Sequence, residues 1–347
     1  MGDDGGGIPS AMKQRFPYFS GWLVRYWFFV GIALVVPAAA AMPEAGVWLR
    51  RWHILKFGIF AVFLVTGLTI DLVQIEGARK NLTAIAASLL SSLTLFPGLV
   101  AVLGTVFFGG MSDFKVGALI LSVAPVTIAS GAVMTGIAGG NIPLSLFICI
   151  AGNIAAIFTV PFSLELMSQG QSTIVLPVVR MITNLFMIII VPIAVGQLLR
   201  LRLKHSLAPF HTGFSVFSQC IVLMIIFNAV TGSAARLGSV GPQLGSLLLF
   251  VCLLHGVVLA MNFGISHLIR LDRAATAAFT IQTSQKTLTV SYLVWAGYFA
   301  DAYPMAVMPA IGYHLTQMVA DTLLAHRLRR WIHYRCKSPA PAAPTDN

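Results

Sequence analysis

Long apolar runs recur along almost the whole chain, and they restrict its fold more than any other feature. A helix needs about 20 apolar residues to cross the hydrocarbon core of a bilayer. Transmembrane β-strands alternate polar and apolar positions over about ten residues, whereas these runs are longer and uniformly apolar. The sequence therefore predicts an all-α integral membrane protein. Its ten expected spans are residues 26–42, 54–75, 82–106, 115–138, 142–166, 174–198, 212–232, 245–268, 274–296 and 303–326.

The shortage of charge supports this prediction. A chain of 347 residues would ordinarily suggest two soluble domains. Only 10% of its residues are charged, against roughly 25% in soluble domains, and its mean hydropathy is +0.87. Such a chain cannot cover the surface of a water-soluble globule. The four cysteines lie far apart without metal-ligand spacing, so we expect no zinc site and no disulfide framework.

The distribution of basic residues predicts an orientation. The net charge is +11, but basic residues cluster in short segments between apolar runs and do not interleave with aromatic residues, so we expect no nucleic-acid partner. With both termini in the cytoplasm, fifteen Lys and Arg residues fall inside and six fall outside. We expect a multi-pass protein of the plasma membrane, or of the inner membrane in a bacterium. Residues 1–25 form a cytoplasmic segment without signal-peptide features, and residues 331–347 form a disordered cytoplasmic tail.

The ten spans divide into two halves, residues 26–166 and 167–330, each with five spans. The fourth span of each half contains a polar, broken segment, at residues 124–141 and 279–292. Matching interruptions in two halves indicate an inverted-repeat transporter whose binding site lies between the repeats. We therefore expect discontinuous helices 4 and 9 that cross.

Lys286 is the most specific signal. It lies in the middle of the ninth span, and its neighbours are polar. A cation at the centre of a membrane helix costs roughly 2.5–3.5 kcal/mol on insertion scales, so such a residue normally faces the protein interior or water. Lys286 either binds an anionic solute or exchanges a proton, or it is a fixed internal charge where another transporter would hold a metal cation. The candidate ligands around it are Gln282, Thr283, Ser284, Gln285 and Thr287.

The fourth and fifth spans supply further polar groups. Pro125 removes a helix hydrogen bond, and nearby glycines loosen the helix after it. A broken helix and tight packing of small residues both remain open as interpretations. The candidate site residues here are Ser130, Thr135, Asn141, Ser145 and Cys149.

The last span adds His314 and Gln317, which lie on nearly the same helix face. His255 is expected to be a hydrogen-bonded core residue. Asp321 lies about a turn from His326 and Arg327, so we expect it at the membrane interface, and Lys286 then has no buried carboxylate partner. Asn184, Gln197, Asn228 and Asn262 are expected to form hydrogen bonds between helices.

Motifs of ATP-driven transport and of hydrolytic or dinucleotide-dependent enzymes do not occur in the sequence. We therefore expect no enzyme activity and no cofactor, apart from Na⁺ or H⁺ as a coupling ion.

The sequence resembles the bile acid:sodium symporter (BASS) superfamily, in particular its divergent SBF-like branch, which shares a fold with cation/proton antiporters. The resemblance covers roughly residues 25–330. It is carried by GLTID at 67–71, VMTGIAGGN at 133–141, VPIAVGQLLR at 191–200, SQKTLTV at 284–290 and YHLTQ at 313–317. It implies ten helices in an inverted five-helix repeat, with a panel domain that moves against a core domain.

Symporters of this family hold two sodium ions near the helix crossing, and the resemblance implies which ligands persist here. The helix-five Ser matches Ser145, whereas the helix-five Thr becomes Cys149. The helix-nine Glu becomes Gln282, and the Gln four residues later becomes Lys286. What remains of a sodium site would consist of Ser130, Ser145 and Gln282. Because a carboxylate is lost and an ammonium gained, we expect at least one family sodium site to be absent.

The sequence thus predicts a secondary transporter of a small, anionic organic solute that works by alternating access, with sodium coupling weakened or replaced. Membrane lipid is the other expected partner, and nothing specifies an oligomeric state. Two alternatives remain open: a non-transporting regulatory protein that retains the fold, and a proton-coupled antiporter or efflux carrier of an inorganic ion.

Overall fold

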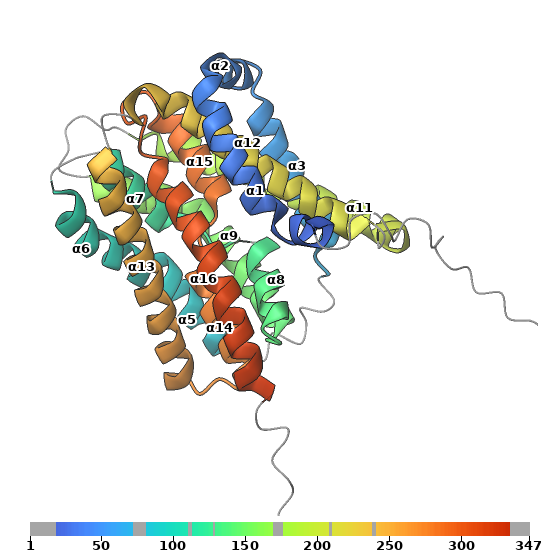
Figure 1. The fold of residues 1–347 in the computed structure, drawn as a ribbon. Coiled ribbons are helices and arrows are strands. Elements are labelled where there is room, and N and C mark those ends of the chain that lie inside the picture. The colour runs from blue at the N-terminus through green and yellow to red at the C-terminus, as the bar shows by residue number, and fades with distance from the viewer. Residues whose placement is uncertain are drawn as a thin grey trace, which may run out of the picture.

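A computed structural model describes residues 19–71, 81–109, 113–127, 129–168, 176–207, 210–237 and 241–333. Within these ranges the chain forms helices and no strands (Figure 1). The helices are α1 (Phe19–Ala41), α2 (Pro43–Arg51), α3 (Ile54–Thr69), α5 (Leu82–Leu90), α6 (Phe96–Phe108), α7 (Asp113–Val123), α8 (Ala129–Ile137), α9 (Ile142–Ser168), α10 (Val178–Leu185), α11 (Val191–Leu207), α12 (His211–Leu237), α13 (Gly241–Leu268), α14 (Arg273–Ser284), α15 (Leu288–Tyr298) and α16 (Met308–His333). Two π-helical segments, η3 (Ser91–Leu95) and η4 (Phe186–Ile190), join α5 to α6 and α10 to α11.

Each predicted span overlaps a helix or a pair of helices, which confirms an all-α membrane fold. Within the described ranges, five helical stretches are long and apolar enough to cross a bilayer: Leu82–Phe108, Ile142–Met167, Val178–Leu203, Gly213–Gly232 and Gln243–Leu268. The bent pair of α1 and α2 raises this number to six. Because α7, α8, α14 and α15 are half-length helices, the two interrupted spans do not pass this test. The ten crossings and the inverted repeat therefore stay predictions.

The two chain ends differ in part from expectation. Helix α16 continues to His333, so the first three residues of the predicted disordered tail are helical. The rest of that tail, and most of the predicted cytoplasmic segment 1–25, lie outside the described residues. The third helix stops at Thr69, earlier than the predicted end of the second span.

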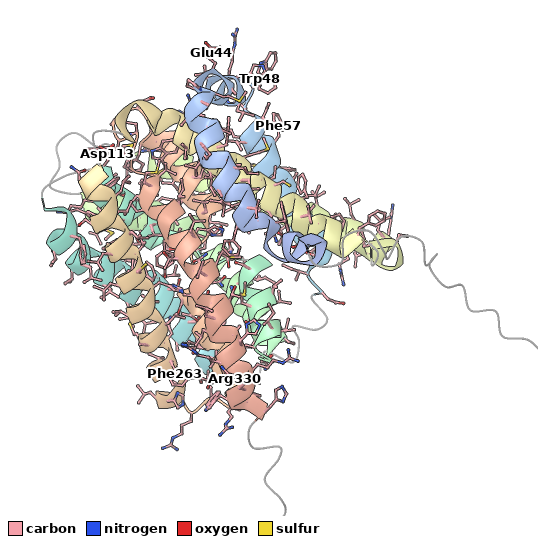
Figure 2. All side chains as sticks on the ribbon, viewed as in Figure 1. Glu44, Trp48, Phe57, Asp113, Phe263 and Arg330 are labelled. Atoms are coloured by element: carbon pink, nitrogen blue, oxygen red, sulfur yellow. The ribbon has the colours of Figure 1, made fainter. Side chains whose placement is uncertain are left out.

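Helix α2 is an element that the apolar pattern did not predict. The chain bends by 95° between α1 and α2, and Pro43 starts the new helix, where a missing N–H costs nothing. Glu44 lies in its first turn and Arg50 and Arg51 in its last, which suits the helix dipole. Figure 2 shows Glu44 and Trp48 at one end of the molecule and Arg330 of α16 at the opposite end.

Helices α3 and α11 pack backbone to backbone. A Cβ atom on Gly67 would lie 2.3 Å from the Ile193 carbonyl oxygen, and one on Gly196 would lie 2.3 Å from the Leu64 carbonyl oxygen. Gln197 Nε2 donates to the carbonyls of Gly67 and Ile70, at 2.7 and 2.8 Å. Glycine is therefore required at this contact. Helices α1, α2, α3, α11 and α12 pack mainly against one another.

The other helices form a second group around α14 and α16. Asn262 of α13 contacts Ser91 and donates to Ser284 Oγ at 2.8 Å, which joins three segments. Asn228 donates to the Gly46 carbonyl, and Asn184 donates to the Tyr298 hydroxyl. With Gln197, these contacts confirm that the four amides predicted to form hydrogen bonds between helices do so.

Candidate functional site

Two interrupted helices meet at the centre of the described fold. Helix α7 ends at Val123 and α8 begins at Ala129, while α14 ends at Ser284 and α15 begins at Leu288. Between α14 and α15 the backbone is extended, with ψ of 148° at Gln285 and 121° at Thr287. The Thr287 N–H donates to the Pro125 carbonyl oxygen at 2.9 Å, so the two breaks contact each other directly. Both predicted spans are therefore interrupted, and the two interruptions lie against each other.

Lys286 lies in the second break, and its ammonium points into a set of oxygens. Nζ donates to the carbonyls of Ser92, Ser122 and Ala124 at 2.7, 2.9 and 2.8 Å, and it lies 3.1 Å from Ser92 Oγ. The Phe96 ring centroid lies 4.4 Å from Nζ. The side chain is 1% exposed, and among the described residues these dipoles and the ring are what stabilise its charge.

The local sequence explains why the Ser92 and Ser122 carbonyls have no hydrogen-bond donor within their own helices. Ser92 lies in a π-helical segment whose carbonyls pair five residues ahead, as Ser91 does with the Phe96 N–H. The corresponding partner of Ser92 would be Pro97, which has no N–H. Ser122 lies at the end of α7, where helix carbonyls lose their intrahelical partners. Lys286 supplies the missing donors.

Gln317 of α16 holds the backbone of Lys286. Its Oε1 accepts the Lys286 N–H at 2.9 Å, and its Nε2 donates to the Lys286 carbonyl oxygen at 3.0 Å. The same Nε2 lies 3.0 Å from His314 Nδ1. A buried amide thus replaces the helical hydrogen bonds lost at the break, as buried backbone groups require.

A second polar cluster joins α8, α9 and α14. Ser145 Oγ donates to Gln282 Oε1 at 2.7 Å and lies 3.2 Å from Thr135 Oγ1. Gln282 Nε2 donates to the Thr127 carbonyl oxygen at 2.6 Å. Gly131 faces this amide so closely that a Cβ there would lie 2.0 Å from Gln282 Oε1.

These residues form a poor sodium site. The oxygens of Ser145, Thr135 and Gln282 are neutral and already bond to one another, and Ser130 lies in a different cluster. The residual sodium ligands implied by the family resemblance therefore do not fit the ion well.

Gln285 connects the first break to α16. Its Oε1 accepts hydrogen bonds from Thr127 Oγ1 and from Ser130 Oγ, the latter at 2.8 Å. Its Nε2 donates to Asp321 Oδ2 at 2.6 Å. The expectation that Asp321 lies at the membrane interface is wrong, because this side chain is fully buried. The difference arises because Asp321 pairs with the buried His255 of α13. The prediction that His255 is a hydrogen-bonded core residue is confirmed.

The remaining predicted residues have separate roles. Asn141 Oδ1 accepts the Leu144 N–H at 3.0 Å and so stabilises the start of α9. The Thr283 hydroxyl lies 2.8 Å from Ser88 Oγ. Cys149 is buried in an apolar cluster, where its sulfur accepts from Asn153 Nδ2 at 3.5 Å.

A cavity of about 190 Å³ lies beside the crossing, between the two helix groups. This volume exceeds that of a single buried water site. The second break and α15 contribute Thr287, Leu288 and Thr289, and α9 contributes Asn153. Its other lining residues are Phe28, Val62, Phe63, Thr66, Thr127, Ser130, Val133, Met134, Ser215, Ser218, Gln219, Val222, His314 and Met318.

Three of the predicted site residues line this cavity: Ser130, Thr287 and His314. Lys286 does not line it, and neither do Gln282, Thr283, Ser284, Gln285, Thr135, Asn141, Ser145, Cys149 and Gln317. The sequence interpretation did not single out Ser92, although SLLSSLTL places a serine pair inside an apolar span. The lining residues of α3 and α12 carried no sequence signal beyond isolated hydroxyls.

An all-helical membrane fold whose two interrupted helices cross beside a cavity is typical of secondary transporters. Comparison with known proteins agrees. Residues 26–330 match the SBF-like CPA transporter family, and the chain belongs to this family.

The relatives are cotransporters. The chain is 27% identical over 321 residues to the probable sodium/metabolite cotransporter BASS4, chloroplastic, of Oryza sativa subsp. indica, which covers 87% of this chain and 75% of that protein. It is 25% identical over 331 residues to sodium/bile acid cotransporter 7 of Xenopus tropicalis, which covers 91% of this chain and 95% of that protein. These findings confirm the resemblance and the prediction of a membrane transporter rather than an enzyme.

Proposed function

We propose that this protein is a secondary active transporter that carries a small organic anion by alternating access. The observation that supports the proposal most is the cavity, which lies between the two helix groups and touches both helix breaks. A site bordered by two separately packed groups can open to either side when one group moves against the other.

An anionic solute suits the polar lining. Helices α8 and α15 both begin beside the cavity, through Ser130 and through Leu288 and Thr289. Helix N-termini carry partial positive charge and unpaired N–H groups, so two of them favour a carboxylate or a similar group. Among the described lining residues there is no Asp, Glu, Lys or Arg to oppose or replace this effect.

The solute also carries a hydrogen-bond donor in this proposal. Asn153 is 2% exposed, and its Oδ1 has no hydrogen-bond partner among the described residues, although Nδ2 is paired. A buried acceptor without a partner costs about 1–3 kcal/mol. A hydroxyl of the solute would supply the partner, and the relatives are named for cotransport of bile acids and metabolites.

Sodium coupling is weakened or replaced by Lys286. Its ammonium occupies a set of four oxygens, three of them backbone carbonyls of the kind that bind alkali cations in channels. Because this cation is part of the chain, it occupies the oxygens permanently. Occupation of the site then no longer depends on external sodium. In this proposal the protein lies in the plasma membrane, and the balance of basic residues described above supports an orientation with both termini in the cytoplasm.

Counterflow in proteoliposomes tests the transport function. Labelled taurocholate and short organic carboxylates serve as probes, because counterflow requires no knowledge of the coupling ion. Ser218→Trp fills the cavity from α12, whereas Cys220→Trp changes an exposed position on the same helix. We expect accumulation of at least one probe with wild type and the Cys220 variant, and a loss of at least tenfold with the Ser218 variant. Wild type without flux of any probe under any gradient would instead support a non-transporting regulatory protein.

A further inference from the structure

A buried acid–base pair joins α13 and α16 behind the helix crossing. His255 Nε2 lies 2.9 Å from Asp321 Oδ1, and the two side chains are 1% and 0% exposed. His255 Nδ1 lies 3.0 Å from the Tyr313 hydroxyl, which donates to the Ser284 carbonyl oxygen at 2.7 Å. Neither the predicted ligand set nor the transport proposal uses this pair.

The hydrogen-bond partners determine where its protons lie. The Ser284 carbonyl can only accept, so the Tyr313 hydroxyl proton points to it. The same hydroxyl therefore accepts from His255, which places a proton on Nδ1. A neutral ring then has a lone pair on Nε2 facing Asp321 Oδ1, and one further proton must lie between these atoms. The pair holds one exchangeable proton, as imidazolium with carboxylate or as imidazole with carboxylic acid.

Gln285 links this proton to the cavity. Its Nε2 donates to Asp321 Oδ2, while its Oε1 accepts from the hydroxyls of Thr127 and Ser130, which line the cavity. A solute anion that takes these hydroxyl donors competes with Gln285 Oε1. Displacement of Gln285 then removes a hydrogen bond from Asp321 and opens a route from the cavity to the pair.

Other charged and titratable groups lie around the pair. Tyr313 contacts His255, and its ring packs against Phe96 at 5.6 Å between centroids. The Lys286 ammonium lies over that Phe96 ring and is directed at carbonyls. His314 follows Tyr313 on α16 and pairs with Gln317. Helix α13, which carries His255, also carries Cys252, whose sulfur lies 3.9 Å from Thr316 Oγ1.

We propose that the His255–Asp321 pair binds and releases the coupling proton of the transport cycle. The inference rests on the transport function proposed above and names its coupling ion. One proton from water on one side adds to the carboxylate–imidazole pair, and after the access changes the same proton leaves to water on the other side. Loss of the proton leaves an uncompensated buried carboxylate, which is strongly unfavourable. Proton release therefore requires water from the cavity to reach Asp321, and this water can enter only after Gln285 moves.

Infrared difference spectroscopy on the full-length protein in lipid tests the proposal without any solute, since the probe is pH itself. Wild type should show a carboxyl band or a histidine band that changes with pH. In Asp321→Asn the amide can donate to Nε2 of a neutral ring and still accept from Gln285, so the pair stays hydrogen-bonded without an exchangeable proton. We expect the band to disappear in this variant and to persist in Asp301→Asn and His267→Gln, which change exposed residues.

If Asp321→Asn does not fold, a second variant tests the same proposal. Tyr313→Phe keeps the carboxylate but removes the acceptor that fixes the Nδ1 proton, so the pH midpoint of the band should shift. A band that survives in Asp321→Asn, or a midpoint that does not move in Tyr313→Phe, overturns the proposal.

Flux separates this inference from the transport function itself. A pH gradient should drive uptake in wild type of the probe that accumulates in counterflow, and Asp321→Asn and His255→Gln should reduce that uptake at least tenfold. Uptake at the wild-type rate in both variants shows that the pair is not the proton site, while the transport function stands. The infrared band without flux of any probe in wild type contradicts the transport function, and the pair then binds a proton that is not coupled to transport.

Discussion

The side-chain amide of Gln317 forms hydrogen bonds with both backbone groups of Lys286, the residue at which the ninth predicted span is interrupted. One residue of α16 thus compensates for the hydrogen bonds that the break removes. The break is consequently a fixed feature of the fold and does not need a bound ion to hold it.

Gln317→Ala should destabilise the protein, because it leaves a buried N–H and a buried carbonyl of Lys286 unpaired. We expect the free energy of unfolding to fall by about 1–3 kcal/mol. Thermal unfolding of the purified protein in detergent measures the effect. Thr316→Ala, next to it on α16, removes only a distant contact to Cys252 and serves as control. Equal melting temperatures for the two variants would mean that the amide contributes nothing to the break.

Gly131→Ala should force Gln282 out of its position, since the new Cβ would lie 2.0 Å from Oε1. Overpacking of this kind costs about 1–3 kcal/mol. In a Gln282→Ala background the same substitution should cost close to nothing, because the atom that it strikes is gone. A double-mutant cycle of unfolding free energies checks this coupling. Gly136→Ala on the same half-helix, where the nearest atom is 3.3 Å away, is the control. Additive effects would show that the close approach does not exist.

Gly196→Ala should separate α3 from α11, because its Cβ would meet the Leu64 carbonyl at 2.3 Å and a backbone atom cannot turn aside. A loss of about 1–3 kcal/mol in the free energy of unfolding is expected. Gly256→Ala on α13 has open space around the new methyl group and should be neutral or stabilising. Unfolding curves of both variants under one condition decide the matter. A Gly196 variant as stable as wild type contradicts the backbone contact.

Much of the fold was predictable because apolar runs and their interruptions are properties of the sequence itself. Pro125 and the polar residues around Lys286 indicated both helix breaks, and the structure places them in contact. Helix α2 was not predicted, since its nine residues are too short and too polar to form an apolar run. Its only sequence signals are Pro43 and Glu44 in its first turn and Arg50 and Arg51 in its last.

The partners of the site residues were harder to predict than the residues. Lys286 was recognised from its charge in an apolar run, but its carbonyl partners come from backbone whose availability depends on Pro97 and on the end of α7. Asp321 was misplaced because spacing to His326 and Arg327 indicates an interface, whereas its burial depends on His255, 66 residues earlier in the chain. Such pairings depend on packing between distant helices and leave no local pattern.

The central claim is that the Lys286 ammonium takes the place of a sodium ion, and thermal stability in different salts tests it without knowledge of the solute. The melting temperature of wild type should be the same in sodium chloride and in choline chloride at equal ionic strength. Lys286→Gln, which removes the ammonium from the oxygens of Ser92, Ser122 and Ala124, should be stabilised by sodium and not by choline, since a ligand that binds only the folded state raises its stability. Wild type that sodium stabilises, or a Lys286→Gln variant that sodium leaves unchanged, would contradict the account.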